Sequence, residues 1–295
     1  MKPISMMKRA GFTAIAGLMA INAFAQDEVS IVNITDNIHM LVGKGGNIGV
    51  STGADGTFLI DDKFAPMTGN IIEALKSLGG DSATYLVNTH FHGDHSGGNE
   101  NFGKTGTLIL SHENVRTRLA DGSTVSAFNM VTPPQSGSAL PVITFSEEMT
   151  VHLNGDAINV IHVPNAHTDG DSIVHFSDSN VIHTGDVFFN GFFPFIDVEH
   201  GGSVIGTINA VDAILALSND DTVIIPGHGA LSNVTELKAY REMLDTAQTR
   251  LSKLKAEGKD AAAAAAMNPL SDLDEQWGTV MFNAYRWISI IYDGI

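Results

Sequence analysis

Four short apolar segments follow one another early in the chain, separated by clusters of Gly, Asn and Asp. They occupy residues 29–32, 38–42, 47–50 and 57–60. Apolar runs of this length between turn-forming clusters are typical of β-strands, and their close spacing predicts an antiparallel meander. Apolar residues then recur at positions 71, 72, 75 and 78, which predicts an amphipathic helix over residues 66–78 that ends at Gly79 and Gly80.

The second half of the chain repeats this order of elements. Strand patterns over residues 142–176, with a hairpin turn at residues 154–156, precede a helix at 204–217, a strand at 222–225 and a helix at 235–257. Near the C-terminus, a helix is expected over residues 273–292, and the alanine run at 261–266 is either a partly exposed helix or a low-complexity linker. These patterns alone indicate a domain of the α/β or α+β class.

A segment without periodicity lies between the two halves. A strand at 107–110 and a short helix at 113–119 lead into residues 120–141, which contain two consecutive prolines and many small polar residues. A segment of this length in a compact domain is usually a lid, a binding loop or a mobile stretch. We expect it, together with the turn at residues 43–47, to form the rim of a binding groove.

The first 25 residues have the pattern of a secretory signal peptide. Lys2, Lys8 and Arg9 precede an apolar segment at 10–21, and residues 23–25 have the small-x-small pattern of a cleavage site. The apolar segment is shorter than the roughly 20 residues of a membrane span. We expect cleavage that leaves residues 26–295 as a single periplasmic or secreted domain without stable membrane insertion; an uncleaved anchor is the alternative.

Composition narrows the class of protein further. Hydrophobic residues make up 43% of the 295 positions, which fits an ordinary packed core. The chain has no cysteine, which excludes disulfides, a lipid-modified N-terminal cysteine and thiolate metal ligands. Without the signal peptide it has 13 basic and 33 acidic residues, a net charge of −20. Such a surface disfavours nucleic acid as a partner and is compatible with a small-molecule substrate, and no pattern indicates an oligomeric state.

The densest group of metal-ligand residue types follows the apolar run at 85–88. His90, His92, Asp94 and His95 lie within six positions, and glycines at 93, 97 and 98 allow a sharp turn out of the strand. Imidazole nitrogen and carboxylate oxygen are ligands that suit zinc. The segment therefore predicts a metal site at the end of a buried strand.

Three more ligand-type residues stand at the ends of apolar strands. His167 follows the run at 160–166, Asp186 follows 181–185, and His228 follows 223–227. A rigid sheet that places ligands at its strand ends would provide a preorganised metal site.

In order and spacing, the motifs HFHGDH, NAHTDGD, TGD and PGHG resemble the metal-binding motifs of the metallo-β-lactamase fold superfamily, and the resemblance covers residues 31–240. It implies an α+β fold, a four-layer αββα sandwich in which two mixed sheets face each other and the metals lie in a groove at one edge. It also implies two zinc ions per chain. The implied ligands are His90, His92 and His167 for the first metal, Asp94, His95 and His228 for the second, and Asp186 as a bridge.

The resemblance also suggests roles for nearby polar residues. Thr168, Asp169 and Asp171 are candidates for hydrogen bonds to the ligand imidazoles, or else simple turn residues. The remaining histidines are expected to be structural: His39, His112, His152, His162, His175, His183 and His200.

The expected chemistry is hydrolysis. Two divalent ions ~3.5–4 Å apart can share a water molecule and lower its pKa, so that a metal-bridging hydroxide attacks a carbonyl carbon. Asp94 is the expected catalytic residue, because its carboxylate could orient the hydroxide and relay its proton. We therefore expect an exported dinuclear-zinc hydrolase that cleaves a cyclic amide, ester or thioester, with β-lactams among the candidate substrates.

The resemblance to β-lactamases is incomplete. One lactamase subclass carries cysteine in place of Asp186, followed by a lysine that binds the carboxylate of the drug, whereas this chain continues with Val187, Phe188 and Phe189. The presence of both His95 and Asp186 is more similar to glyoxalase II, lactonases and other general hydrolases. Two alternatives remain: a mononuclear-iron enzyme similar to persulfide dioxygenases, and a non-catalytic metal-binding accessory protein.

A phenylalanine-rich run at residues 188–195 follows the expected bridging ligand. Its position makes it a candidate for an apolar wall of the substrate groove. Packing of the same side chains between the sheet and a helix is an equally good interpretation.

Overall fold

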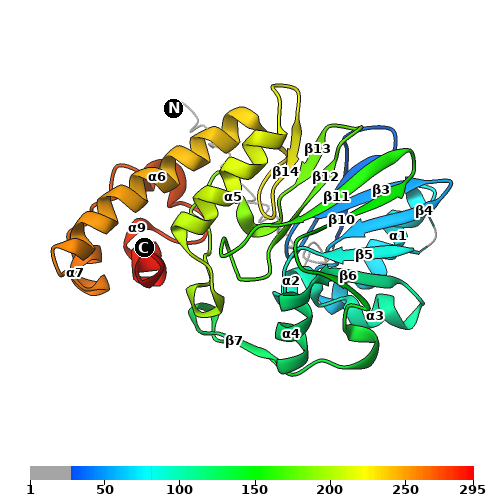
Figure 1. Ribbon diagram of the computed structural model, residues 1–295, viewed down its shortest axis with the longest axis horizontal. Helices are drawn as coiled ribbons and strands as arrows, with labels where there is room; N and C mark the ends of the chain where they lie inside the picture. The colour runs from blue at the N-terminus through cyan, green and yellow to red at the C-terminus, as the bar shows by residue number, and fades with distance from the viewer. Residues whose placement is uncertain (1–27, 81) are drawn as a thin grey trace, which may run out of the picture.

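Two mixed β-sheets form the centre of the protein in a computed structural model, which describes residues 28–80 and 82–295 (Figure 1). The expected signal peptide, residues 1–25, lies outside the described residues. Within the described ranges, no helix is both long enough and apolar enough to cross a membrane.

The first sheet has seven strands in the order β1-β2-β3-β4-β5-β6-β9. The first four strands are antiparallel, and β4, β5, β6 and β9 run parallel to one another. The strands are β1 (Ser30–Asn33), β2 (Ile38–Val42), β3 (Ile48–Gly53), β4 (Gly56–Ile60), β5 (Tyr85–Asn88), β6 (Leu108–His112) and β9 (Ile143–Phe145). The crossover from β4 to β5 passes through α1 (Thr68–Ser77), as parallel strands require.

The second sheet has six strands in sequence order, β10 to β15. It again begins with four antiparallel strands, and α5 (Val204–Leu217) then connects β13 to the parallel strand β14. The strands are β10 (Glu148–Leu153), β11 (Asp156–His162), β12 (Ser172–Phe176), β13 (Val181–His183), β14 (Val223–Ile225) and β15 (Ser232–Asn233). The two halves therefore share one order of elements, as the sequence pattern predicts.

Three apolar layers define a four-layer αββα sandwich. One layer lies between the two sheets. A second packs the first sheet against α1 and α3 (Asn99–Lys104), and the third packs the second sheet against α5, α6 (Val234–Ala256) and the C-terminal helices. The expected α+β fold is confirmed, because helices cover the outer face of each sheet (Figure 1).

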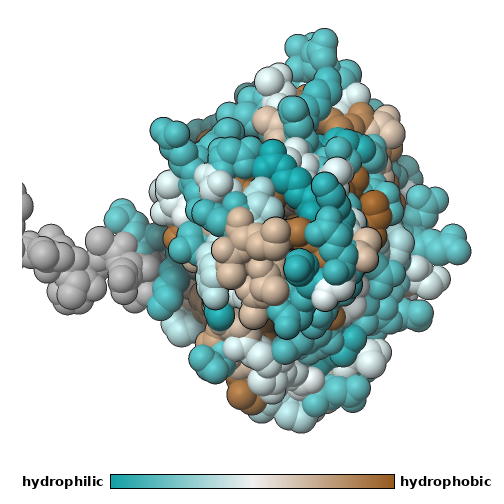
Figure 2. Space-filling view, turned by 90° about the vertical axis from the view of Figure 1, so that its left-hand side faces the viewer, coloured by the Kyte–Doolittle hydropathy of each residue, from teal (hydrophilic) through white to brown (hydrophobic). Residues whose placement is uncertain are grey.

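The C-terminal helices extend the layer outside the second sheet. They are α7 (Ala261–Ala266), α8 (Asp274–Trp277) and α9 (Ala284–Ile291). Figure 2 looks at this end of the molecule and shows a mainly hydrophilic surface around a small apolar area. The predicted single helix over 273–292 is wrong, because residues 278–283 separate α8 from α9, and the Asn283 side chain caps the start of α9.

The segment at 120–141 also departs from the prediction. It is not without secondary structure, because β7 (Ser123–Val125) and β8 (Met130–Thr132) form a small antiparallel hairpin after α4 (Glu113–Asp121). Each strand is three residues long, too short for a period-two pattern to show in the sequence.

Trp287 on α9 joins the C-terminal helices to the phenylalanine-rich segment. Its ring stacks on Phe193 at 4.3 Å, and its Nε1 donates a hydrogen bond of 2.7 Å to the carbonyl of Pro194. We expect Trp287→Ala to lower the free energy of unfolding by about 3–5 kcal/mol, because the side chain is fully buried. Chemical denaturation measures this change.

The matched control is Tyr285→Ala on the same helix, where the side chain is 55% exposed. We expect that variant to change the free energy of unfolding by less than about 0.5 kcal/mol. Equal effects of the two substitutions would contradict the packing role of Trp287.

Candidate metal centre

The ends of five strands from the two sheets meet at one edge of the sandwich. Asp61 follows β4, the segment His90 to His95 follows β5, and His167, Asp186 and His228 follow β11, β13 and β14. The structure brings all seven residues predicted as ligands to this place, in two groups whose potential ligand atoms lie within 4.8 Å of one another. The groups are His90, His92, His167 and Asp186, and Asp94, His95 and His228.

Asp186 lies between the two groups. One carboxylate oxygen, Oδ1, is 3.0 Å from Nε2 of His95. The other, Oδ2, is 3.4 Å from Nε2 of His228, 3.6 Å from that of His167 and 3.8 Å from that of His90. A single carboxylate thus faces donors of both groups, the position expected of a bridging ligand.

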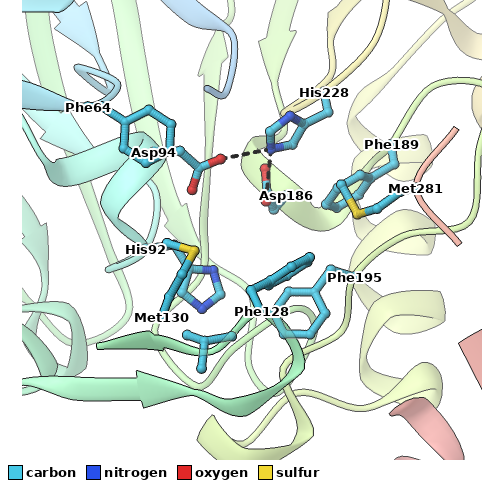
Figure 3. Close-up of a pocket in the computed structure, with 11 residues that line it drawn as sticks. Phe64, His92, Asp94, Phe128, Met130, Asp186, Phe189, Phe195, His228 and Met281 are labelled. Atoms are coloured by element: carbon cyan, nitrogen blue, oxygen red, sulfur yellow. Dashed lines mark ion pairs between the residues drawn. The ribbon is translucent and has the colours of Figure 1, made fainter. Parts of the chain in front are cut away.

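Asp94 completes the second group from the side of a cavity. Its Oδ2 is 3.3 Å from Nε2 of His228 and 3.6 Å from Nε2 of His95. Figure 3 shows Asp94, His228 and Asp186 pointing toward one another, with His92 below them. The side chains of Asp94 and His228 are 22% and 18% exposed, so this side of the centre is open to a substrate.

Two glycines allow the segments to approach this closely. A Cβ on Gly46 would stand 2.0 Å from the ring of His95, and one on Gly227 would stand 2.2 Å from a carboxylate oxygen of Asp186. The turn of Gly46 also lies against the one-turn helix α2 (Gly93–Ser96), since its N–H donates to the carbonyl of Asp94. The tight packing fixes the direction of the ligand-type side chains.

Hydrogen bonds fix which nitrogen of His167 and His92 carries the proton. Nδ1 of His167 lies 2.8 Å from the carbonyl oxygen of Phe195, which can only accept, so Nδ1 must donate. Nε2 of His92 lies 2.8 Å from the Asp197 carboxylate and donates to it for the same reason. In their neutral forms, both rings turn an unprotonated nitrogen toward the centre.

Asp61 imposes the same arrangement on His95 and His90. Its carboxylate accepts hydrogen bonds from Nδ1 of His95 at 2.7 Å and from the Thr89 hydroxyl at 2.8 Å. Because the Thr89 hydroxyl gives its hydrogen to Asp61, its oxygen can accept from Nδ1 of His90, 3.1 Å away. In the neutral forms of both rings, Nε2 is thereby left unprotonated.

The inward-facing atoms lie at close range. In the neutral rings, Nε2 of His167 and Nδ1 of His92 both carry electron pairs and are 2.9 Å apart. Nε2 of His95 is 3.0 Å from Oδ1 of Asp186, with which it forms an ion pair when the ring is protonated. Nε2 of His90 is buried and has no hydrogen-bond partner. Electron pairs that converge in this way repel each other unless a cation lies among them, so the donor set fits divalent metal ions.

Burial keeps two histidines of the first group neutral, which is the form of imidazole that binds a metal ion. Burial lowers the pKa of His90 well below its usual value and that of His167 to about 4, so both rings are neutral at pH 7. For His95 and His228, burial acts in the same direction, but the carboxylate of Asp186 and its neighbours outweigh it and raise the pKa, to about 9 for His228. Protons and metal ions therefore compete for these two rings.

The residues that orient the imidazoles differ from the sequence candidates. Asp171 accepts hydrogen bonds from Thr168 and from the N–H of His167, and Asp169 pairs with Arg118 at 2.7 Å, so none of the three candidates reaches a ligand imidazole. These residues instead shape the loop that carries His167.

Asp61 and Asp197 take the orienting role. Asp61 had a signal in the sequence, since it is the first polar residue after the apolar strand β4, the same position that marks the ligands. Asp197 had none, because it lies in an irregular segment far from His92 along the chain. His200, expected to be structural, donates its Nδ1 hydrogen to the same Asp197 oxygen at 2.7 Å.

Some side chains of the phenylalanine-rich segment pack in the core, and others line a cavity. Phe188 packs on Tyr240, and Phe193 stacks on Trp287, both in the core. Phe189 and Phe195 line a cavity beside Asp94 and His228. Phe189 also stacks on the ring of His228 at 5.0 Å, which holds that imidazole in place.

Asp197 gives a test of how His92 is positioned. We expect Asp197→Asn to weaken metal binding about 10–100-fold, because a neutral amide oxygen accepts more weakly from His92 and His200 than the buried carboxylate does. Competition against a chromogenic chelator measures the affinity. Asp272→Asn, which removes an exposed ion pair with Arg250 outside the candidate centre, is the control, and its metal affinity should stay at the wild-type value; equal losses in both variants would contradict the role of Asp197.

Comparison with known proteins agrees with this geometry. Over 147 residues the chain is 29% identical to a probable hydroxyacylglutathione hydrolase of Schizosaccharomyces pombe, a match that covers 48% of this chain and about half, 47%, of that protein. It is 26% identical over 162 residues to the hydroxyacylglutathione hydrolase GloC of Haemophilus influenzae, covering 55% of this chain and 76% of the relative.

Solved structures share the fold at lower identity. The DIM-1 metallo-beta-lactamase is 17% identical with a TM-score of 0.60, covering 75% of this chain and 98% of that one. The sec-alkylsulfatase Pisa1 from Pseudomonas sp. is 16% identical with a TM-score of 0.69, covering 90% of this chain and 50% of that one. The family model described as "Metallo-beta-lactamase superfamily" matches residues 40–228, which span the strand ends and all seven converging residues. This chain therefore belongs to the metallo-β-lactamase superfamily.

Proposed function

We propose that the protein is an exported dinuclear-zinc hydrolase that cleaves a cyclic amide, ester or thioester. The convergence of seven ligand-type residues in two adjoining groups carries this proposal. His90, His92 and His167 would hold one zinc ion, Asp94, His95 and His228 would hold the other, and Asp186 would bridge them.

The relatives support hydrolysis and favour one class of bond. Two curated relatives are named as hydroxyacylglutathione hydrolases, although the chain spans only about half of the first one. Hydrolysis of an acyl group from glutathione cleaves a thioester, which is among the bonds that the proposed chemistry can attack. A thioester is therefore the first bond to test, before lactams.

Bound zinc ions would lower the pKa of a water molecule and polarise the carbonyl of the substrate. Asp94 would then accept the proton of this water molecule. Burial raises the pKa of Asp94, but His95 and His228 outweigh that effect and hold it below its usual range, so the residue is a carboxylate at neutral pH. It can accept a proton from the attacking water and deliver it to the leaving group on the open side of the centre.

Metal content and hydrolysis together test the proposal. Elemental analysis of the purified protein should give about two zinc ions per chain, and the zinc-loaded protein should hydrolyse a thioester. Turnover of a chromogenic cephalosporin as well would make β-lactams substrates. One iron per chain without hydrolysis would contradict the proposal and favour the oxidoreductase alternative, and bound zinc without any hydrolysis would favour the accessory protein.

His92→Ala tests the assignment of the residues. We expect hydrolysis to fall below detection while the far-ultraviolet circular dichroism spectrum stays unchanged, because the side chain faces the centre rather than the core. His152→Ala, at an exposed position on β10, is the control and should keep wild-type activity. Activity retained in His92→Ala at equal metal content would refute the assignment.

Export is the remaining element of the proposal, and the sequence of residues 1–25 supports it. Expression of the full chain in a Gram-negative host, followed by osmotic release, should yield a periplasmic protein whose intact mass corresponds to a start at Gln26. A cytoplasmic product that retains residue 1 would contradict export without affecting the proposed chemistry.

A further inference from the structure

A small cavity beside the candidate metal centre has apolar walls (Figure 3). Its volume is about 180 Å³, and His92, Asp94, Asp186 and His228 form its polar end. Pockets that enclose a whole drug-sized ligand measure about 300–1,000 Å³, so this cavity holds one group of a substrate rather than all of it.

Phe64, which follows β4, lines one side of the cavity, and three segments far apart in the chain build the rest of the walls. The β7–β8 hairpin, the phenylalanine-rich segment and the loop between α8 and α9 each contribute large apolar side chains. They are Val125, Phe128 and Met130 from the hairpin, Phe189 and Phe195 from the second segment, and Met281 from the third.

The hairpin is held over the centre by contacts on both of its sides. The N–H of Ser126 donates to the Glu199 carboxylate at 3.2 Å, and Arg286 on α9 donates to a backbone carbonyl of the hairpin at 3.4 Å. Phe128 packs edge-to-face on Phe195 with ring centroids 4.9 Å apart. The wall is therefore a defined surface beside the ligand-type residues.

Three of the wall residues leave much apolar surface uncovered. Phe128, Met130 and Met281 are 39%, 38% and 37% exposed, although each is a large apolar side chain. Together they border the mouth of the cavity (Figure 3). An apolar group that covers them is stabilised by roughly 25 cal/mol for each Å² of apolar surface removed from water.

Cationic side chains are missing from this wall. No described residue that lines the cavity is lysine or arginine. Arg286 lies behind the hairpin and lines a different pocket, and Lys44 is exposed in the turn at residues 43–47. A carboxylate of the substrate that entered the wall region away from the metal ions would therefore be buried without a partner, which is unfavourable.

We propose that this site selects substrates in which the group beside the scissile carbonyl is uncharged and apolar, an alkyl or aryl acyl chain, and that the β7–β8 hairpin determines this selectivity. The inference rests on the proposed hydrolase function and narrows its substrate class. An acyl chain that ends in a carboxylate would meet no lysine or arginine among the described lining residues, so such a chain is disfavoured.

Matched thioesters test the substrate class. The hexanoyl and acetyl thioesters of N-acetylcysteamine differ only in the apolar acyl chain, and the adipoyl monothioester of N-acetylcysteamine carries a carboxylate in place of the terminal methyl group of hexanoyl. We expect kcat/KM to be at least about tenfold higher for hexanoyl than for acetyl, and higher for hexanoyl than for adipoyl. A preference for acetyl, or for adipoyl, would overturn the inference.

Variants of the hairpin test which residues are responsible. Phe128→Ala should lower kcat/KM for the hexanoyl thioester about tenfold more than for the acetyl thioester, because only the longer chain reaches the wall. Val131→Ala is the matched control on the same hairpin, where the side chain is 72% exposed and does not line the cavity. Equal losses for both thioesters in Phe128→Ala would assign Phe128 a structural role and overturn the selectivity argument.

A gain of function gives an independent readout. Met281→Lys places an ammonium group at the mouth of the cavity, so it should shift the ratio of kcat/KM for the adipoyl and hexanoyl thioesters toward adipoyl by about tenfold or more. An unchanged ratio in a folded, metal-loaded variant would contradict the argument that the missing cation sets the preference.

A binding measurement separates failure of the inference from failure of the proposed function. Calorimetric titration with N-methylhexanamide, an uncharged amide that carries the hexanoyl chain on its carbonyl, reports on the apolar wall without turnover. If no thioester is hydrolysed but the amide binds and Phe128→Ala weakens it, the hydrolase proposal fails and the apolar site stands. If thioesters are hydrolysed but neither binding nor selectivity depends on Phe128, the hydrolase proposal stands and this inference fails.

Discussion

The candidate metal centre depends on two buried carboxylates that fix the protonation of the imidazoles around it. Asp61 accepts hydrogen bonds from His95 and from Thr89, and Asp197 accepts from His92 and His200. Each carboxylate is no more than 1% exposed, and a buried charge is tolerated only when it has partners. The hydrogen bonds that satisfy these charges are the same bonds that turn unprotonated nitrogens inward.

The backbone around Asp61 is strained. Asp61 and Lys63 both have left-handed conformations, with φ of 64° and 58°, and both side chains are fully buried. Such a conformation costs roughly 1–2 kcal/mol for each residue other than glycine. Local bonds offset this strain, because Lys63 donates to the carbonyl of Gly46 and Asp62 accepts from the N–H of Gly98 at 2.8 Å. Strained, buried and charged residues gathered at one strand end are typical of functional sites.

The sequence predicted those parts of the structure that depend on local pattern. The strands, the crossover helices and the ligand-type residues at strand ends could be recognised because each signal lies within about ten residues. Asp197 could not be recognised, because its partner His92 is 105 residues away and the segment between them has no periodicity that relates the two. The phenylalanine-rich segment was ambiguous for a related reason. Phe188 and Phe189 are adjacent and both are apolar, yet one faces Tyr240 in the core and the other faces the cavity.

The acidity of the chain and the apolar wall act on a substrate at different ranges. The net charge of −17 repels anions over the surface, but at physiological ionic strength this repulsion is screened within about 8 Å. Inside the cavity the walls are mostly apolar side chains, which screen a charge less than bulk water does, and no lysine or arginine stands among its described lining residues to pair with an anion. Near the ligand-type residues, bound metal ions would reverse the sign of the field and attract the carbonyl oxygen. Under the proposed function, a substrate with a polar reacting carbonyl and an apolar flank would satisfy both environments, so we expect the wall rather than the net charge to select the group beside the scissile bond.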